Sequence, residues 1–353
     1  MAGKVLVTGG AGYIGSHVVK ELGKAGYDIV VYDNCSTGHP QAVLYGELVI
    51  GDLADRDCLA KTFAQHKITA VFHFAALTSA PESVRHPLTY YSNNTCNTLT
   101  LLQLCQRFNV KQFIFSSTAA VYGEPEQNPV SETAPTLPIN PYGRSKLMSE
   151  WLIQDYAAAS EMRYVILRYF NVAGADPGGQ IGSFSCQASH LIKIACDAAL
   201  GRRFGVNIYG TDFNTPDGTG VRDYIHVSDL ADAHLKALQY LENGGESKIL
   251  NCGYGEGYSV RQVLEMVKHL SGVDFCVVES ERRPGDPACV IAHSNLIQQF
   301  LGWKPQYHHL QTLVQTALDW EKYLHERGTS LPQYQTVKSQ TSLVSRDQRL
   351  NSS

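Results

Sequence analysis

A tyrosine and a lysine four residues apart are the side chains of this sequence best suited to proton transfer. Tyr142 and Lys146 begin and end the segment Tyr-Gly-Arg-Ser-Lys, behind an Asn-Pro pair that favours the start of a helix. Residues four apart share one helical face. A free tyrosine, with a pKa of about 10, is a poor base at neutral pH, but a nearby ammonium group stabilises its phenolate. We therefore predict that Tyr142 is a general base toward an alcohol and that Lys146 is its electrostatic partner.

Three hydroxyl side chains upstream strengthen this prediction, because the Tyr-x-x-x-Lys spacing alone also occurs by chance on helix surfaces. Ser116, Ser117 and Thr118 directly follow the apolar run Phe113–Phe115. A hydroxyl at the end of that strand can bridge a substrate oxygen and the tyrosine. Since the carboxyl ends of parallel strands meet at one edge of a sheet, we expect these groups to converge.

A glycine-rich turn near the amino terminus predicts a dinucleotide site. Gly9, Gly12 and Gly15 form a G-x-x-G-x-x-G pattern, which also reads as G-x-G-x-x-G from Gly10, between an apolar run and a helical pattern. Glycine is needed where the chain turns tightly and approaches a pyrophosphate, and the following helix presents its positive end to that anion. A bound dinucleotide would also bring a positively charged nicotinamide ring, a second stabiliser of the Tyr142 phenolate.

An acidic residue 18 positions after the last glycine indicates which dinucleotide this is. Asp33 ends the second predicted strand, where its carboxylate can accept hydrogen bonds from the adenosine ribose. No Arg or Lys lies between Asp33 and His39, so a ribose 2′-phosphate would meet a negative charge without a counter-ion. NAD is therefore favoured over NADP. Asp52, after the third strand, is a candidate adenine contact, although an ordinary turn aspartate would look the same.

The elements that must position these groups are short apolar strands separated by helical patterns, which is typical of a Rossmann-type doubly wound parallel sheet. We expect every strand to be buried on both faces, and a helix after Tyr142 with Leu147, Trp151, Leu152 and Tyr156 as its buried stripe. The predicted strands are 4–8, 29–32, 48–50, 70–74 and 113–115.

The sequence pattern changes near residue 176, where helical patterns become less regular and Gly and Pro more frequent. This change predicts a second domain. We assign 1–175 to an NAD-binding Rossmann domain and 176–327 to a smaller C-terminal α/β domain for the substrate. Segments at about 223–255 could return to the first sheet. The Ser-, Gln- and Thr-rich stretch 328–353 has few large apolar groups, so we expect a disordered tail.

Composition excludes several classes of function. The formal net charge of −4 is a poor match to nucleic acid or to an anionic membrane, and no apolar segment is long enough to span a bilayer. Without a signal-peptide pattern, cytoplasmic residence is the expectation. The nine cysteines form no C-x-x-C pair, so we expect no metal site, no disulfides and mostly buried, reduced thiols.

Short segments shared with a known enzyme group occur in order along the chain. They are Thr8–Gly15, Asp33–Asn34, Gly51–Asp52, Phe74–Ala76, Ser116–Thr118 and Tyr142–Lys146, then Arg168–Ala175, Asp217–Val227 and Arg282–Asp286. The first six resemble the extended short-chain dehydrogenase/reductase superfamily. The last three resemble its UDP-glucose 4-epimerase family, over about residues 3–325.

The resemblance implies a tightly held NAD that is recycled while a UDP-hexose is oxidised and reduced at C4, in a homodimeric isomerase acting on UDP-galactose and UDP-glucose. Thr118 matches the family's catalytic hydroxyl, beside Tyr142 and Lys146. The implied cofactor contacts, besides Tyr142 and Lys146, are Gly9, Gly12, Tyr13, Ile14, Gly15, Asp33, Asn34, Ser36, Asp52, Leu53, Phe74, Ala75, Ala76, Asn93, Ser116 and Phe170. The implied substrate contacts are Thr118, Tyr142, Asn171, His190, Leu191, Arg222, Tyr224, Arg283, Asp286 and Val290.

Departures from the family pattern leave the sugar open. Lys193 replaces a usual proline, and Thr78 stands where some members have lysine. Val290 falls where a bulky tyrosine would exclude N-acetyl sugars, which suggests some tolerance of UDP-N-acetylhexosamines. A 4-epimerase of another UDP sugar (a pentose or a uronic acid) is the nearest alternative. A nucleotide-sugar dehydratase or decarboxylase is less favoured, because Ala119 and Ala120 follow Thr118 where dehydratases commonly carry an Asp-Glu pair. A non-catalytic NAD sensor is the alternative from another class.

Overall fold

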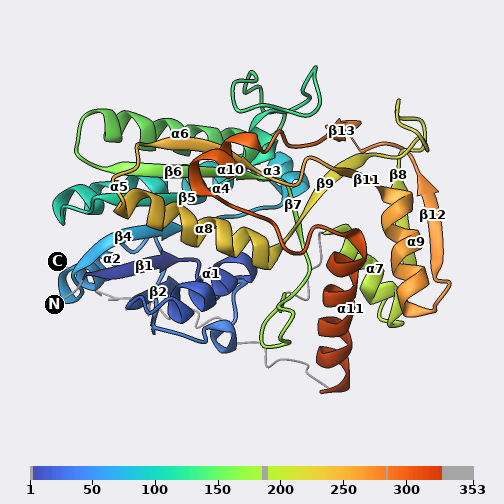
Figure 1. The fold of residues 1–353 in the computed structure, drawn as a ribbon, viewed down its shortest axis with the longest axis horizontal. Coiled ribbons are helices and arrows are strands. Elements are labelled where there is room, and N and C mark those ends of the chain that lie inside the picture. The colour runs from blue at the N-terminus through green and yellow to red at the C-terminus, as the bar shows by residue number, and fades with distance from the viewer. Residues whose placement is uncertain (1–2, 185–189, 284, 328–353) are drawn as a thin grey trace, which may run out of the picture.

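A seven-stranded parallel sheet forms the centre of the computed structural model, which describes residues 3–184, 190–283 and 285–327 (Figure 1). The strand order is β10-β6-β5-β4-β1-β2-β3, so the chain runs outward from β1 in both directions, as in doubly wound sheets. The Rossmann-type fold class is confirmed. The strands are β1 (Lys4–Thr8), β2 (Ile29–Asp33), β3 (Glu47–Ile50), β4 (Ile68–His73), β5 (Gln112–Thr118), β6 (Arg163–Tyr169) and β10 (Lys248–Cys252).

Helices cover both faces of this sheet, because consecutive strand residues point to opposite sides. Val5 and Val7 of β1 pack with α1 (Tyr13–Lys24), α8 (Val227–Glu242) and α10 (Asn295–Leu301), whereas Leu6 packs with the other layer. That second layer consists of α2 (Arg56–Gln65), α5 (Asn97–Arg107) and α6 (Pro141–Ala158). Short elements fill the connections: η1 (Pro40–Ala42), α3 (Ala80–Arg85), α4 (Pro87–Tyr90), the π-helical η2 (Tyr91–Cys96) and η3 (Ala119–Val121).

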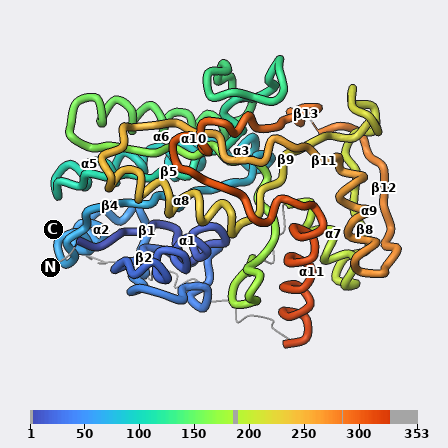
Figure 2. Tube along the Cα trace, viewed as in Figure 1, coloured from blue at the N-terminus to red at the C-terminus, as the bar shows by residue number. Residues whose placement is uncertain are grey.

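The remaining elements pack beyond the carboxyl edge of the large sheet, around a separate apolar cluster (Figure 2). The strand β9 pairs with β7, β11 and β13, and β8 pairs with β12. The helices α7, α9 and α11 pack on one another. The bounds are β7 (Asn171–Ala173), α7 (Leu191–Ala199), β8 (Gly205–Tyr209), β9 (Val221–His226), β11 (Gly257–Ser259), α9 (Val260–Ser271), β12 (Cys276–Ser280), β13 (Cys289–Val290) and α11 (Leu310–Glu326). The division into two domains at residue 176 stays a prediction, and the tail predicted at 328–353 lies outside the described residues.

Three expectations about burial were wrong. The strand β3 is not buried on both faces, and Ile50 is 59% exposed, because β3 is the edge strand of the sheet. Trp151 is 53% exposed rather than part of the buried stripe of α6. Of the eight described cysteines only Cys105, Cys196 and Cys252 are buried.

No helix in the described parts of the chain is long and apolar enough to cross a membrane. Within the same residues, no group of three or more His, Cys, Asp or Glu side chains is arranged to hold a metal ion.

Candidate active site

The turn between β1 and α1 is built on glycines that the surrounding backbone requires. Gly9 has a φ of +71°, and a Cβ added there would lie 2.5 Å from the Ala75 backbone nitrogen. A Cβ added at Gly15 would lie 2.2 Å from the Gly9 carbonyl oxygen. These contacts hold the first turn of α1 tightly against β1 and the loop after β4. Gly9 and Gly15 are therefore explained by the packing of the protein itself.

Gly12 is different, because little of the protein's own structure fills the space beside it. A Cβ added there would approach only the Gly9 carbonyl oxygen, at 3.2 Å. Gly12 is also the N-cap of α1 and offers no side chain to the free N–H groups of the first turn. Open space and unpaired N–H groups at a helix amino terminus suit a pyrophosphate. The residues present therefore fit the dinucleotide that the sequence implies.

Asp33 lies beside this turn at the end of β2. Its carboxylate accepts hydrogen bonds from the backbone N–H groups of Ala11, at 2.9 Å, and Cys35, at 2.8 Å. Burial raises its pKa, and these two hydrogen bonds counteract the rise. Next to it, the Asn34 side chain donates to Asp52 at 2.7 Å. Asn34, an implied cofactor contact, thus connects to Asp52, and both lie near Asp33; Asp33 and Asp52 are the two residues predicted to hold the adenosine end.

The other predicted cofactor residues fall into two groups. Ala75, Ala76 and Asn93 are half-buried in the loop after β4 and in η2, and Ser36 is exposed after β2. Others are engaged in protein contacts: Leu53 belongs to the core, Ile14 and Phe74 pack on the core, Ser116 is hydrogen-bonded to Tyr169, and the Tyr13 hydroxyl donates to the Gly174 carbonyl oxygen at 2.6 Å.

Tyr142, Lys146 and Thr118 converge at the carboxyl edge of β5. Tyr142 and Lys146 lie in the first two turns of α6, whose N-cap Asn140 accepts a hydrogen bond from the Gly143 N–H at 2.9 Å. Thr118 is the last residue of β5. The exposed fractions of Tyr142, Lys146 and Thr118 are only 9%, 3% and 9%. The constellation therefore lies in a site that largely excludes water.

Burial shifts the pKa values of the base and its partner in opposite directions. It raises the pKa of Tyr142 to about 12, and a hydrogen bond with Thr118 counteracts part of the rise. Burial lowers the pKa of Lys146 to about 7, against the attraction of the Glu150 carboxylate. The Lys146 ammonium lies 4.5 Å from the centre of the Phe115 ring. Both groups are far from their ordinary pKa values, as is common where chemistry is done.

Sequence reasoning missed Asn94, a residue that clamps this region. The Asn94 side chain accepts from the Leu77 N–H at 2.9 Å and donates to the Leu77 carbonyl oxygen at 3.0 Å and to the Ser145 hydroxyl at 2.9 Å. It thereby ties the loop after β4 to α6, between Tyr142 and Lys146. The family resemblance pointed to Asn93 and not to Asn94. The sequence pattern of the π-helical segment η2 gave no indication that Asn94 is buried and hydrogen-bonded.

The predicted substrate residues gather on the small sheet around β9. Asn171 of β7 is paired with Tyr224, and Val290 of β13 is paired with Arg222. Burial lowers the pKa of Arg222, the nearby Asp286 raises it, and the nearby Arg283 lowers it. Val290 packs with Phe170 and Ala292 in a buried apolar cluster that Ala119 also contacts. The cluster therefore contacts the residue that directly follows Thr118.

Arg283 and Asp286 are paired with each other. Their ion pair measures 2.7 Å, and the Arg283 side chain is 49% exposed and stacks on the Tyr209 ring at 4.6 Å. A guanidinium that faces solvent can exchange a carboxylate for a phosphate at small cost, since exposed ion pairs contribute little.

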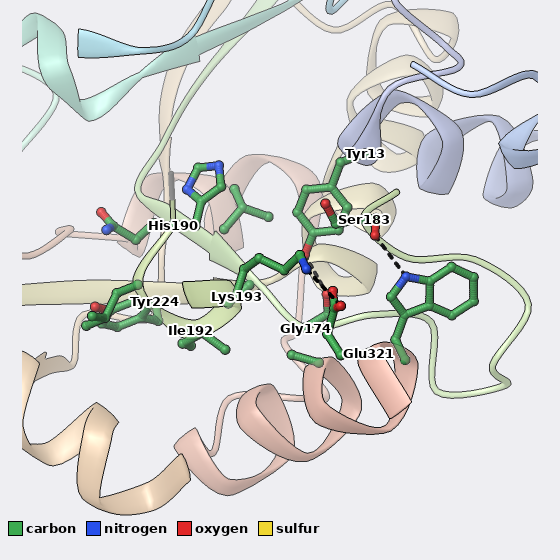
Figure 3. Close-up of a pocket in the computed structure, with 14 residues that line it drawn as sticks. Tyr13, Gly174, Ser183, His190, Ile192, Lys193, Tyr224 and Glu321 are labelled. Atoms are coloured by element: carbon green, nitrogen blue, oxygen red, sulfur yellow. Dashed lines mark hydrogen bonds and ion pairs between the residues drawn. The ribbon is translucent and has the colours of Figure 1, made fainter. Parts of the chain in front are cut away.

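A small cavity lies between α1, β7, α7 and α11 (Figure 3). Tyr13 from the glycine-rich turn reaches it from one side, and His190 at the start of α7 from another. Lys193 and Glu321 form a 2.8 Å ion pair at its wall. The predicted residues that line this cavity are Tyr13, Asn171, His190, Leu191 and Tyr224.

Comparisons with known proteins give matches over most of the chain. Residues 5–253 match the NAD dependent epimerase/dehydratase family. A UDP-glucose 4-epimerase of Azospirillum brasilense is 52% identical over 324 residues, covering 92% of this chain and 93% of that protein. The structure of a UDP-glucose 4-epimerase from Brucella ovis in complex with NAD has a TM-score of 0.87 and 45% identity, covering 90% of this chain and 98% of that one. The UDP-Glc/GlcNAc 4-epimerase of Campylobacter jejuni has a TM-score of 0.80 and 45% identity, covering 91% and 100%.

Proposed function

We propose that this chain, which belongs to the NAD dependent epimerase/dehydratase family, is a UDP-glucose 4-epimerase that interconverts UDP-galactose and UDP-glucose. The observation that carries the proposal is the convergence of Tyr142, Lys146 and Thr118 at the sheet edge that also holds the glycine-rich turn. The chain is 52% identical to a curated UDP-glucose 4-epimerase over 92% of its length. The enzyme is thus an NAD-dependent isomerase rather than a net oxidoreductase.

The three side chains divide the work at the sugar C4 hydroxyl. Tyr142 removes the hydroxyl proton and later returns it, acting as general base and then as general acid. Thr118, which is hydrogen-bonded to Tyr142, positions the substrate oxygen against the phenol. Lys146 supplies positive charge that favours the phenolate. Bound NAD supplies a reversible acceptor for the C4 hydride, so the sugar passes through a 4-keto form.

The small sheet holds the UDP part of the substrate in this proposal. Arg222 lies where β9 and β13 meet, and its guanidinium suits a diphosphate. Asn171 and Tyr224 lie side by side on β7 and β9. Arg283, with its partner Asp286, supplies a second guanidinium from the exposed loop. The diphosphate would thus anchor the substrate while the sugar meets the base.

The sequence after Thr118 favours epimerisation over dehydration. Thr118 leads directly into η3, whose residues Ala119, Ala120 and Val121 carry no acid or base. Elimination of water needs an additional proton donor and acceptor next to the sugar. Epimerisation needs only the base and the hydride acceptor, which matches the groups present.

A second activity, on UDP-N-acetylhexosamines, is favoured by Val290. Its side chain closes the apolar cluster with Phe170 and Ala292, and valine leaves room that a tyrosine would fill. A structural relative at 45% identity is a UDP-Glc/GlcNAc 4-epimerase. We expect turnover of UDP-N-acetylglucosamine that Val290→Tyr abolishes while UDP-galactose turnover persists. Failure of the unmodified enzyme on UDP-N-acetylglucosamine, alongside success on UDP-galactose, would remove this second activity.

We propose that two copies associate through the outer faces of α5 and α6. Leu99 of α5 is 43% exposed, and Met148 and Trp151 of α6 are 38% and 53% exposed. Burial of such groups between copies would stabilise a homodimer. Light scattering should give a dimer for the unmodified protein and a smaller species for Trp151→Lys. Cytoplasmic residence stays a prediction from the sequence.

The decisive experiment is incubation of the purified protein with UDP-galactose and no added NAD. Formation of UDP-glucose would support both the reaction and a retained cofactor. If NAD remains bound but no UDP-hexose is converted, the sensor alternative is favoured and the epimerase proposal fails. Conversion of UDP-pentoses or UDP-uronic acids in place of hexoses would reassign the sugar.

A further inference from the structure

A fully buried carboxylate lies directly behind the three proposed catalytic groups. Glu150 is 0% exposed and is located one turn after Lys146 on α6. It accepts a hydrogen bond from the Ser117 hydroxyl at 2.5 Å, and Arg168 of β6 donates to both of its oxygens, the shortest contact being 2.6 Å. A charge placed so deep needs a reason, because burial without compensation is costly.

The network joins three elements at the point where the site is built. Ser117 and Arg168 are paired neighbours on β5 and β6, and Ser117 directly precedes Thr118. Arg168 also donates to the Tyr122 hydroxyl at 3.1 Å, and Tyr122 donates to Asn251 of β10 at 2.6 Å. Glu150 is the only member of this network on α6. It therefore links the strand that ends at Thr118 to the helix that carries the base.

We propose that Glu150 is a positioning residue for the epimerase reaction, holding Thr118 on β5 in register with Tyr142 and Lys146 on α6 through its hydrogen bond to Ser117. This inference rests on the proposed function. The geometry supports it because Tyr142, Lys146 and Glu150 are spaced by four residues each along one helical face. A shift of β5 against α6 would separate the Thr118 and Tyr142 hydroxyls before it disturbed either element internally.

Glu150 also sets the charge around Lys146. Burial lowers the pKa of Lys146 to about 7, and attraction to Glu150 raises it. Lys146 has no hydrogen bond or ion pair of its own within the described parts of the chain. The other titratable groups that interact with Lys146, Tyr142 or Glu150 are His73 of β4, Tyr122 after η3, and Tyr164, Arg168 and Tyr169 of β6. Burial lowers the pKa of His73 to about 3, and Glu150 is the carboxylate among these groups.

Ser117→Ala separates the positioning role from the charge, because it deletes the hydrogen bond to Glu150 and leaves the ion pair with Arg168 intact. We expect kcat for UDP-galactose to fall roughly 10- to 100-fold, with KM and NAD content unchanged. Thr62→Val is the matched control, since it removes another buried hydroxyl hydrogen bond, to the Cys58 carbonyl oxygen, on the distant helix α2. The control should keep the unmodified kcat.

Glu150→Gln and Glu150→Asp test the charge. In Glu150→Gln the ammonium form of Lys146 loses its counter-charge, so the pKa of Lys146 falls and the alkaline limb of the rate profile moves to lower pH. Glu150→Asp keeps the charge and should keep that limb. The pKa of Lys146 can be followed without turnover, by NMR titration of protein labelled with carbon-13 lysine.

These measurements distinguish the inference from the proposed function. If unmodified protein converts no UDP-hexose, the proposed function fails, while the NMR titration still decides the effect of Glu150 on Lys146. Equal kcat values for Ser117→Ala and Thr62→Val would overturn the positioning role. An unchanged Lys146 pKa in Glu150→Gln would overturn the charge effect. A general loss of stability in Ser117→Ala with kcat preserved in the folded fraction would mean that the network is only structural.

Discussion

The glycine-rich turn offers a matched pair of substitutions with opposite expected effects. Gly15→Ala places a Cβ 2.2 Å from the Gly9 carbonyl oxygen and 2.8 Å from the Gly10 Cα. Both obstacles are backbone atoms, so the turn itself must move. Overpacking of this kind costs about 1–3 kcal/mol, and we expect the upper end. Alanine regains about 1 kcal/mol over glycine inside a helix, which leaves a net loss of about 2 kcal/mol.

Gly12→Ala should instead leave folding almost unchanged. Its φ of −77° and ψ of 173° are accessible to alanine, and the added Cβ approaches only the Gly9 carbonyl oxygen at 3.2 Å. The stability change should stay within about 1 kcal/mol. The same methyl group projects into the space assigned to the pyrophosphate. We therefore expect NAD affinity to fall at least about tenfold, or ~1.4 kcal/mol.

Thermal unfolding of NAD-free protein and calorimetric titration with NAD measure the two effects separately. Gly15→Ala should lower the Tm by roughly 4 °C, at ~2 °C per kcal/mol for a chain of this size. Gly12→Ala should unfold near the unmodified protein. Unmodified NAD affinity in Gly12→Ala would refute the location of the pyrophosphate. Equal stability of the two variants would refute the packing argument for Gly15.

Three further outcomes follow from the structure. Tyr142→Phe should reduce kcat by at least about 100-fold and leave NAD content unchanged; rates like those of the unmodified enzyme would remove Tyr142 from the base role. Lys20→Met should destabilise the fold by about 3–5 kcal/mol, because it leaves the Asp176 carboxylate without its 2.5 Å ion pair, in which the Lys20 and Asp176 side chains are 4% and 9% exposed. Urea unfolding measures the loss in the free energy of unfolding, and a change under about 1 kcal/mol contradicts the prediction. Burial lowers the pKa of His17 to about 4 and of His226 to about 3, so the unfolded chain binds protons before the folded chain does. The free energy of unfolding should therefore be highest above about pH 6.5 and fall as the pH drops toward 4. Unfolding free energies that stay constant across that window would contradict this.

The fold class could be predicted from the sequence because the composition of each central strand marks its position. The runs that became β1, β2, β4 and β5 are short and apolar, and those of β1, β2 and β5 are followed directly by glycine or polar residues. Strand order is a different matter, since composition does not say which strand lies at an edge. Ile50 therefore looked like a core residue, although β3 has only one neighbour and leaves it exposed. Trp151 was predicted to be buried for the same reason, because apolar character predicts burial without indicating what the side chain packs against.

The candidate site divides along a similar boundary. Residues proposed to touch a ligand directly, such as Asp33 and Tyr142, belong to short patterns whose chemistry can be argued from spacing. Residues that hold those groups in place act through contacts between distant segments. Asn94 reaches Leu77 and Ser145, and Glu150 reaches Ser117 and Arg168. Nothing in their local sequence indicates such partners, although an acid spaced four residues after Lys146 on the same helical face could have prompted the question.

The pKa values of the base and its partner explain why the supporting residues matter. Burial is the largest influence on both groups and, even with the opposing influences included, leaves the pKa of Tyr142 raised to about 12 and that of Lys146 lowered to about 7. The protein by itself therefore favours the neutral phenol and weakens the ammonium that should assist it. Each opposing influence comes from a group held in place: Thr118 at the phenol and Glu150 behind the lysine. Proton removal then requires further positive charge beside Tyr142. The nicotinamide ring of an NAD held at the glycine-rich turn would supply it at the same sheet edge. A base that stays protonated until the cofactor is present cannot act on the sugar alone.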